Sequence, residues 1–185
     1  EQTALTVMEQ AQVFGSDAER LASTATDWAA RTHAGRGLVI ASTNEQTQLL
    51  NGLIRDRLAA TGIIGTGRTV TTAPAGGRWE SETISVGDVV ATRVNAQGVD
   101  GHRYANRERW RVHGIDRHGD VRLVSLDGSR AAQLTAQAAR QHLQLAYAVT
   151  GYGAQGITVD EAVQLVDDGM DRPAFYVGAT RGRYT

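Results

Sequence analysis

Lysine is absent from this sequence. All 19 basic side chains among its 185 residues are arginine. A phosphate-binding loop of the G-x-x-x-x-G-K-[ST] type needs its lysine to reach the β- and γ-phosphates of a nucleotide. The chain therefore contains no such loop, and catalysis by a lysine Schiff base or a lysine general base is excluded as well. A GC-rich genome would replace lysine with arginine in this way, and the exclusion holds whatever the cause.

Cysteine is absent too, which excludes disulfides, thiol catalysis and the usual zinc frameworks. His102, His113 and His118 have no neighbours at metal-ligand spacing, so we expect no metal site. Long apolar runs are also missing, because the longest purely aliphatic stretch is Leu38–Ala41. Without a membrane span or a signal-peptide pattern, we expect a cytoplasmic protein with no membrane partner.

The composition indicates a globular protein whose charge is distributed unevenly along the chain. Hydrophobic residues make up 41% of the chain, which begins at Glu1 rather than Met, so we expect a fragment of a longer protein. Residues 66–144 hold 11 arginines against 8 acidic residues, whereas 1–65 and 145–185 each carry a net charge of −2. A slightly basic module between acidic flanks indicates a separate insertion.

The first third of the chain has the sequence pattern of an α/β domain. Ser16 and Glu19 form a capping-box pattern that predicts a helix over 17–33. Leu38–Ala41 is a short apolar run typical of a strand buried on both faces of a parallel sheet. Asn44 is then expected to cap a second helix that ends at Gly62.

The middle of the chain loses this helical periodicity. Short alternating runs at 88–94, 110–115 and 121–126, separated by turn residues, predict a small antiparallel β module of barrel type. A buried strand is expected again at 143–149, followed by a short strand at 162–166 and a helix at 173–180. The simplest topology is one parallel-sheet domain, residues 1–65 and 145–185, interrupted by a β insertion at 66–144.

One motif admits a dinucleotide-binding interpretation. Gly151 to Gly156 reads G-x-G-x-x-G after a strand, and Asp171 lies at the distance of a ribose-binding acid. Against this, only 29 residues follow Gly156, and a Rossmann domain should open with the unit. The β-branched run Ile157–Val159 also interrupts the helix that the motif requires.

The same segment resembles motif V of superfamily 1 helicases. It reads AYAVTGYGAQGITVD from Ala146 to Asp160. The resemblance implies that Thr150 and Tyr152 face DNA, and that Gln155 and Gly156 lie near the nucleotide. The sequence departs from the family where Tyr152 replaces the usual His and Gly153 replaces a Lys or Arg. An aromatic ring can still stack on a base, but one phosphate contact is expected to be missing.

The end of the chain resembles motif VI of the same family. Residues 175–183 read FYVGATRGR, against the usual aromatic-V-A-L-T-R-G-R. The resemblance makes Arg181 the catalytic arginine finger that reaches the γ-phosphate, with Thr180 and Arg183 as further nucleotide-binding residues. A guanidinium suits the role because it stays charged and matches phosphate oxygens with a planar fork. The alternative for Arg181 is a surface salt bridge.

Two further segments agree with this family. Thr43 and Asn44 follow the first strand as in helicase motif IV, which implies DNA contacts. Residues 86–112 resemble the β insertion of conjugative relaxase–helicases of the TraI/TrwC (MobF) type, which implies DNA contacts for Arg93, Asn95, Arg107 and Arg109. The turn before Trp110 departs from that family's Asn-Gly-Asp. Arginines clustered around Trp110 form either a DNA-backbone patch with an aromatic platform or a solvated strand face over a small core.

The resemblance implies a RecA-like α/β domain, the 2A domain of a RecD-like superfamily 1B helicase, interrupted by an SH3-like 2B barrel. The parent would move 5′→3′ on single-stranded DNA by hydrolysing ATP. ATP and Mg²⁺ would be bound mainly by an upstream 1A domain with its Walker motifs, so no cofactor is expected in this piece alone. Further partners would be an upstream relaxase domain and relaxosome or type IV secretion components. A non-catalytic module that binds single-stranded DNA, from a decayed helicase copy, is the alternative.

Overall fold

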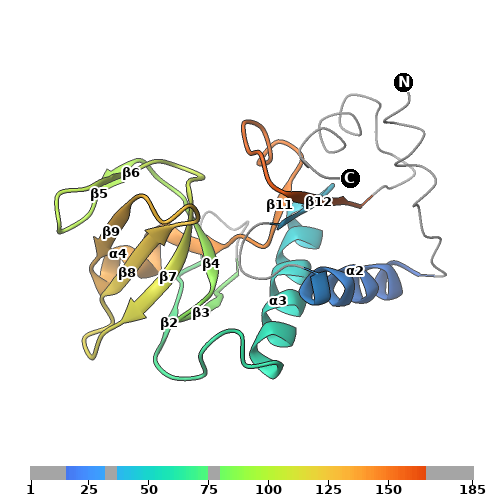
Figure 1. The fold of residues 1–185 in the computed structure, drawn as a ribbon, viewed down its shortest axis with the longest axis horizontal. Helices are drawn as coiled ribbons and strands as arrows, with labels where there is room; N and C mark the ends of the chain where they lie inside the picture. Colours follow the sequence, from blue (N-terminus) through green and yellow to red (C-terminus); the bar gives the residue numbers. More distant parts are fainter. Residues whose placement is uncertain (1–15, 32–36, 75–79, 166–185) are drawn as a thin grey trace. The chain divides into compact units, whose positions relative to one another are not determined.

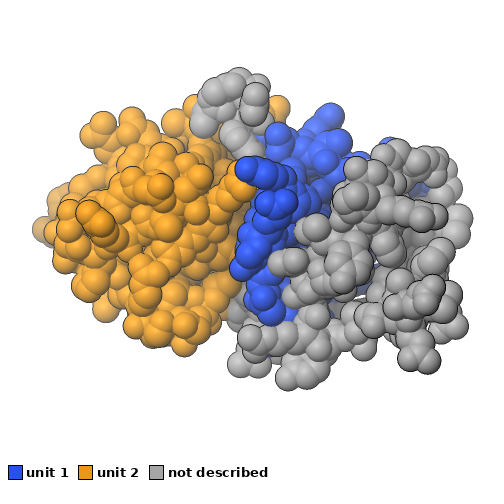
Figure 2. Space-filling model, turned by 90° about the horizontal axis from the view of Figure 1, so that it is seen from above, with its two compact units in different colours: residues 1–53, 148–185 blue, residues 54–147 orange. Residues whose placement is uncertain are grey.

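The computed structural model describes residues 16–31, 37–74 and 80–165 (Figure 1). These residues form a mixed α/β structure with one parallel sheet and several antiparallel ones. The chain divides into two compact units, which Figure 2 colours separately. Unit 1 comprises residues 1–53 and 148–185, and unit 2 comprises residues 54–147. From the sequence, the corresponding domain boundaries were predicted at 65/66 and 144/145.

Helix α2, Asp17–Arg31, begins where the sequence predicts. The Ser16 hydroxyl oxygen accepts a hydrogen bond from the backbone N–H of Glu19 at 3.3 Å, which satisfies one of the unpaired donors of the first turn. Leu21, Ala25 and Trp28 are buried, as their helical spacing predicts. The last predicted residues, up to His33, lie outside the described residues.

The parallel sheet of unit 1 has the strand order β11-β1-β12. Strand β1, Gly37–Ala41, is buried along its whole length, which confirms the prediction of a central strand. It pairs in parallel with β11, Ala148–Thr150, and with β12, Glu161–Gln164. Leu38 and Ile40 pack with Ala154 and Val159 to form the core on this sheet. Aliphatic residues on both faces therefore fix β1 as the middle strand.

Helix α3, Asn44–Ala60, follows β1, and its cap differs from the expected one. Thr43, not Asn44, caps the helix, because its hydroxyl accepts from the Gln46 N–H at 3.1 Å. The Gln46 side chain accepts from the Thr43 N–H at 3.3 Å in return, so the two residues form a capping box one position earlier than predicted. At the other end Gly62 has a φ of +74°, the left-handed stop that the sequence predicts.

Unit 2 contains a five-stranded antiparallel sheet in the order β10-β4-β7-β8-β9. Its strands are β4 Val89–Thr92, β7 Arg109–Ile115, β8 Val121–Ser125, β9 Ala131–Leu134 and β10 Leu143–Leu145. Two small ladders accompany it, β2 Thr69–Thr71 with β3 Thr83–Ser85, and β5 Ala96–Gln97 with β6 Arg103–Tyr104. The three predicted runs at 88–94, 110–115 and 121–126 are confirmed as strands β4, β7 and β8.

Two features of unit 2 correct the sequence prediction. Residues 136–142 were expected to belong to the β module, but they form helix α4, Ala136–His142. The Thr135 side chain caps this helix by accepting from the Ala138 N–H. The strand expected at 143–149 is two strands. Residues 143–145 pair antiparallel with β4, whereas 148–150 pair in parallel with β1. One apolar run therefore supplies strands to two different sheets.

Tyr147 lies between these two strands and belongs to a buried polar network in unit 2. Its hydroxyl donates to the Asp88 carboxylate at 2.5 Å. The same carboxylate accepts from the Ser85 N–H at 2.6 Å and from the Arg55 Nε–H at 3.2 Å. Burial raises the pKa of Asp88, although each of these donors opposes the shift. The network ties helix α3, the β3–β4 turn and the end of β10 together.

Glu82 is a partly buried carboxyl of unit 2, and its protonation makes the stability of the fold depend on pH. Its side chain accepts from the Leu145 N–H at 2.8 Å, and burial raises the pKa of Glu82 to about 7. The folded state therefore keeps a proton on Glu82 up to near pH 7, whereas the unfolded chain releases it near 4.5. Protonation favours the folded state, so this contribution to stability is complete below pH 4.5 and is lost as pH rises to about 7.

We expect Glu82→Gln to remove this loss, because glutamine keeps the acceptor for Leu145 and carries no charge. The free energy of unfolding of the unchanged protein should fall by up to about 3 kcal/mol more than that of the variant between pH 4.5 and 7. Urea unfolding at several pH values measures the difference. Glu80→Gln, at an exposed position two residues earlier, is the matched control and should keep the original slope. Parallel curves for Glu82→Gln and the unchanged protein would contradict the assignment.

Candidate functional site

The residues expected to touch DNA in unit 1 come from two neighbouring parallel strands. Ala41 at the end of β1 is in register with Thr150 at the end of β11. The carboxyl ends of parallel strands meet at the same edge of a sheet, which is where open α/β sheets bind ligands. Thr43 and Asn44 follow β1, and Tyr152 follows β11, so the structure brings these four residues to one edge.

Thr43 and Thr150 each use their hydroxyl oxygen to hold the local backbone. Thr43 accepts from the Gln46 N–H at 3.1 Å, and Thr150 accepts from the Gly153 N–H at 3.1 Å. A hydroxyl that accepts one bond can still donate its proton to a phosphate oxygen. Asn44 is exposed at the first position of α3. Both threonines and Asn44 are therefore able to contact a nucleic-acid backbone.

Tyr152 is the most prominent side chain of this edge, with 67% of its surface exposed. It lies in a turn over residues 151–156 that Ala154 anchors: the Ala154 N–H donates to the Thr150 carbonyl at 2.9 Å, and its side chain is fully buried. A large exposed aromatic on a fixed turn is a suitable platform for base stacking.

Asn51 of helix α3 positions the strand that carries Thr150. This buried side chain accepts from the Ala148 N–H at 2.8 Å and donates to the Ala148 carbonyl at 3.3 Å. A bidentate amide contact of this kind gives β11 a backbone partner on its outer side. The sequence-based prediction assigned Asn51 no role. Its position in the middle of a helix, where a polar residue is rarely buried, was the available signal.

Gln155 and Gly156 are both exposed at the end of the same turn. Gly156 has a φ of +79°, and a Cβ added there would meet no atom within 4 Å. The conformation, rather than crowding, therefore selects glycine in the isolated chain. Open space beside an exposed amide fits the approach of a phosphate group to the backbone, so these residues fit part of a nucleotide site.

The structure also explains why residue 153 is a glycine. A Cβ at this position would lie 3.2 Å from the Thr150 carbonyl oxygen and 3.3 Å from its hydroxyl. The turn as folded here therefore has little room for the Lys or Arg that the helicase pattern usually carries at this position.

The three motif VI residues, Thr180, Arg181 and Arg183, lie outside the described residues, as does the helix expected at 173–180. Their roles stay predictions from the sequence.

The four residues expected to contact DNA in unit 2 have different environments. Arg93 donates to the Gln144 side chain at 3.2 Å and to the Ala73 carbonyl at 3.1 Å, and burial lowers the pKa of its guanidinium. Burial likewise lowers the pKa of Arg109 to about 10. Arg107 is exposed with a φ of 67°, and Asn95 is exposed while its side-chain oxygen accepts from the Asn106 N–H at 2.7 Å. Only Arg107 and Asn95 therefore present their side chains mainly to solvent.

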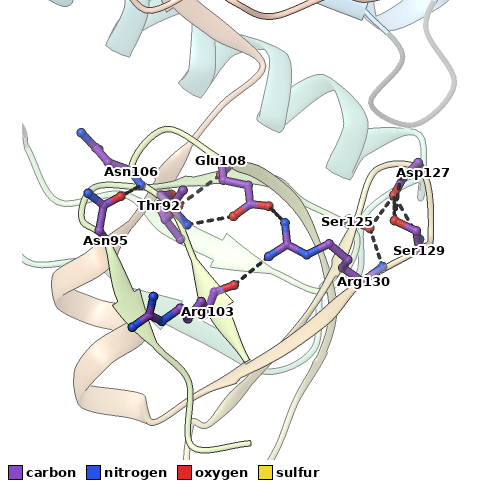
Figure 3. Close-up of polar contacts among 10 residues, drawn as sticks. Thr92, Asn95, Arg103, Asn106, Glu108, Ser125, Asp127, Ser129 and Arg130 are labelled. Atoms are coloured by element: carbon purple, nitrogen blue, oxygen red, sulfur yellow. Dashed lines mark hydrogen bonds and ion pairs between the residues drawn. The ribbon is translucent and has the colours of Figure 1, made fainter. Parts of the chain in front are cut away.

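Trp110 is fully buried, so it belongs to the core of unit 2 rather than to an exposed platform. Arg130 lies over its ring, with the guanidinium carbon 5.2 Å from the ring centroid. The same guanidinium forms an ion pair with Glu108 (Figure 3). The sequence-based prediction did not include Arg130, because the residue comes from a turn 20 positions after Trp110.

Within the described ranges, no three His, Cys, Asp or Glu side chains gather as a metal site would require. No helix in the same ranges is both long and apolar enough to cross a bilayer.

No protein-family model matches the chain, and no curated protein matches its sequence. Solved structures do match its fold. Bacteroides Pif1 bound to single-stranded DNA is 16% identical, with a TM-score of 0.58 over 99% of this chain and 47% of that one. Bacteroides Pif1 in complex with ADP-AlF3 and single-stranded DNA is 15% identical, with a TM-score of 0.58 over 91% and 44%. Pif1 helicase from Candida albicans is 16% identical, with a TM-score of 0.55 over 86% and 47%.

This chain thus spans less than half the length of the helicases that it resembles. At such low identity the likeness concerns the fold alone. The parallel sheet of unit 1 and the antiparallel sheets of unit 2 together give this chain the mixed α/β fold of RecA-like helicase domains.

Proposed function

We propose that this chain is the 2A and 2B part of an ATP-dependent 5′→3′ DNA helicase of superfamily 1B. The observation that carries the proposal is the shared sheet edge of unit 1. The paired ends of β1 and β11 bring Thr43, Asn44, Thr150 and Tyr152 together, and these are the residues that the helicase motifs assign to DNA. The fold likeness to Pif1 helicases, two of them solved with single-stranded DNA, supports the same function.

The chain would form one side of a nucleotide site whose other side lies in a 1A domain. Because the sequence has no lysine, the Walker A loop must come from outside these 185 residues. In this proposal the missing half binds ATP and Mg²⁺, while Arg181 stabilises charge on the transferring phosphoryl group. Gln155, Gly156, Thr180 and Arg183 complete the nucleotide contacts of this side. The SH3-like description of unit 2, with domain boundaries near 65/66 and 144/145, belongs to the same proposal.

The relaxase origin is the finer part of the proposal. It rests on residues 86–112, whose sequence resembles the β insertion of conjugative relaxase–helicases. The partners would then be single-stranded DNA, an upstream relaxase domain and relaxosome or type IV secretion components, and the protein would act in the cytoplasm. Nicking assays with the parent chain test this part: a parent that cannot cleave a plasmid strand at a defined site would contradict it.

The unit 1 edge is tested by binding of a fluorescent twelve-nucleotide thymidine strand to the whole chain at low salt. We expect Tyr152→Ala to weaken binding roughly tenfold, because stacking on an aromatic ring contributes about 1–3 kcal/mol per base. Tyr152→Phe keeps the ring and is the matched control, so it should bind like the unchanged chain. If Tyr152→Ala bound equally well, Tyr152 would not contact DNA.

A non-catalytic DNA-binding module is the second candidate, favoured by the crowding at Gly153 that leaves the turn without a phosphate-binding side chain. Salt dependence separates the two. A dedicated binding module should hold the strand tightly, with an affinity that falls steeply as salt increases, because several counterions are released. A motor half should bind weakly until it is joined to its 1A domain. Only the motor half should then support ATP hydrolysis that DNA stimulates.

A further inference from the structure

Unit 2 contains an open pocket that the sequence did not predict, although one of its lining residues, Asn95, was expected to contact DNA. Its volume is about 570 Å³, and residues of the β5–β6 hairpin, the turn after β6 and the β8–β9 turn line it. The size lies within the range of small-molecule and cofactor sites. The lining side chains that matter for its chemistry are Asn95, Gln97, Arg103, Glu108 and Arg130.

Two of these charges hold one another and form a fixed part of the wall. Arg130 pairs with Glu108 and donates to the Arg103 carbonyl at 2.7 Å (Figure 3). Its guanidinium also lies over the Trp110 ring. Glu108 also accepts from the Ala105 N–H at 2.8 Å. Since both charges are neutralised locally, this pair adds rigidity and little net field. The Arg130–Glu108 pair itself therefore offers no free charge to a phosphate group.

Three other groups remain available to a ligand. The Asn95 oxygen is held by the Asn106 N–H, and the Gln97 amide nitrogen donates to the Gly101 carbonyl at 2.7 Å. These contacts fix both amides and leave the Asn95 NH₂ and the Gln97 oxygen, which have no hydrogen-bond partner among the described residues. The exposed Arg103 guanidinium likewise has no partner there, and Figure 3 shows it extending away from Arg130.

A fixed amide donor, a fixed amide acceptor and a planar cation match the requirements of a nucleobase. Amides pair with the donor and acceptor groups on a base edge, and a guanidinium plane stacks on the face of a base. We propose that this pocket holds one base of a DNA strand, with Arg103 stacked on it and Asn95 and Gln97 at its edge. The proposal rests on the proposed function for the source of the base.

Titration of the isotope-labelled whole chain with 2′-deoxyadenosine 5′-monophosphate tests the pocket, with 2-deoxyribose 5-phosphate as the probe that lacks a base. We expect the nucleotide to shift the side-chain amide signals of Asn95 and Gln97, and the sugar phosphate to shift neither. Equal shifts from the two probes, or none from the nucleotide, would overturn the proposal.

Arg103→Lys separates stacking from charge, because lysine keeps the positive charge without the plane. It should weaken nucleotide binding at least about fivefold, while Arg122→Lys, at an exposed arginine of β8, should change nothing. Unchanged binding by Arg103→Lys would also overturn the proposal. A chain that binds the twelve-nucleotide strand but not the mononucleotide keeps its proposed function and loses this pocket. Nucleotide binding here by a chain that does not bind the strand, even at low salt, would show that the pocket takes a free nucleotide and would overturn the proposal that the base belongs to a DNA strand.

Discussion

Replacing Arg181 with alanine should lower ATP turnover about a thousandfold once this chain is joined to a 1A domain with a Walker A loop. The reason is electrostatic: a guanidinium that reaches the γ-phosphate stabilises charge that develops only in the transition state, and such a finger contributes roughly 10³–10⁵ in rate. Turnover of the joined protein, measured with saturating single-stranded DNA, checks it. Binding of ATP should change much less than kcat, because the contact is strongest in the transition state.

Two matched variants test whether the loss of turnover is specific to the guanidinium group of Arg181. Arg181→Lys keeps the charge but loses the bidentate fork, so it should recover only a small part of the turnover. Arg122→Ala removes an exposed arginine from unit 2 and should leave turnover unchanged. If Arg181→Ala retained activity within a few-fold of the unchanged protein, Arg181 would be a surface residue, and the helicase assignment of motif VI would fail with it.

Elements with a strong local signal were predictable from the sequence. Leu38–Ala41 is apolar at every position, which only a strand buried on both faces requires, and it is the central strand β1. Ser16 and Glu19 marked the start of α2 in the same way. The cap of α3 was predicted one residue late, because Thr43 and Asn44 are both good capping residues and only the reciprocal contact with Gln46 separates them.

Features that depend on distant partners were not predictable. Apart from Gln144, the run from Leu143 to Val149 consists of aliphatic and aromatic residues, so nothing local marks where it divides between two sheets. The division comes from Tyr147, whose hydroxyl bonds with Asp88, 59 positions earlier in the chain. Helix α4 was not predicted, because its seven residues make too few turns for a helical periodicity to be recognised within a strand-rich segment.

The candidate site residues also divide into those with a local sequence signal and those that depend on distant partners. Motif spacing identified Thr43, Asn44, Thr150 and Tyr152, and the parallel register of β1 and β11 places them at one edge. For unit 2 the sequence selected arginines by type and could not distinguish exposed from buried ones. Arg93 and Arg109 are largely taken out of water, whereas Gln97, Arg103 and Arg130 line a pocket that only the tertiary structure forms.

Loss of the Asp88 carboxylate should strongly destabilise unit 2. Asp88→Ala removes an acceptor from three donors at once, those of Arg55, Ser85 and Tyr147, and leaves the partly buried Arg55 without its anion. Removing one partner of a buried ion pair costs about 3–5 kcal/mol. Arg55 keeps some contact with water, so we expect about 3 kcal/mol in the free energy of unfolding, measured by urea titration.

Neighbouring variants separate the network from a general effect of losing an acid. Asp56→Ala removes an exposed carboxylate beside Arg55 on the same helix and should leave the unfolding midpoint nearly unchanged. Tyr147→Phe deletes one donor and keeps the ring in place, so it should destabilise unit 2 by about 1 kcal/mol. In the double variant, Tyr147→Phe should add almost nothing to Asp88→Ala, because its hydroxyl has already lost its acceptor. Full additivity would mean that the two side chains stabilise unit 2 independently, and Tyr147 would then not hold the chain at the point where it passes from β10 to β11.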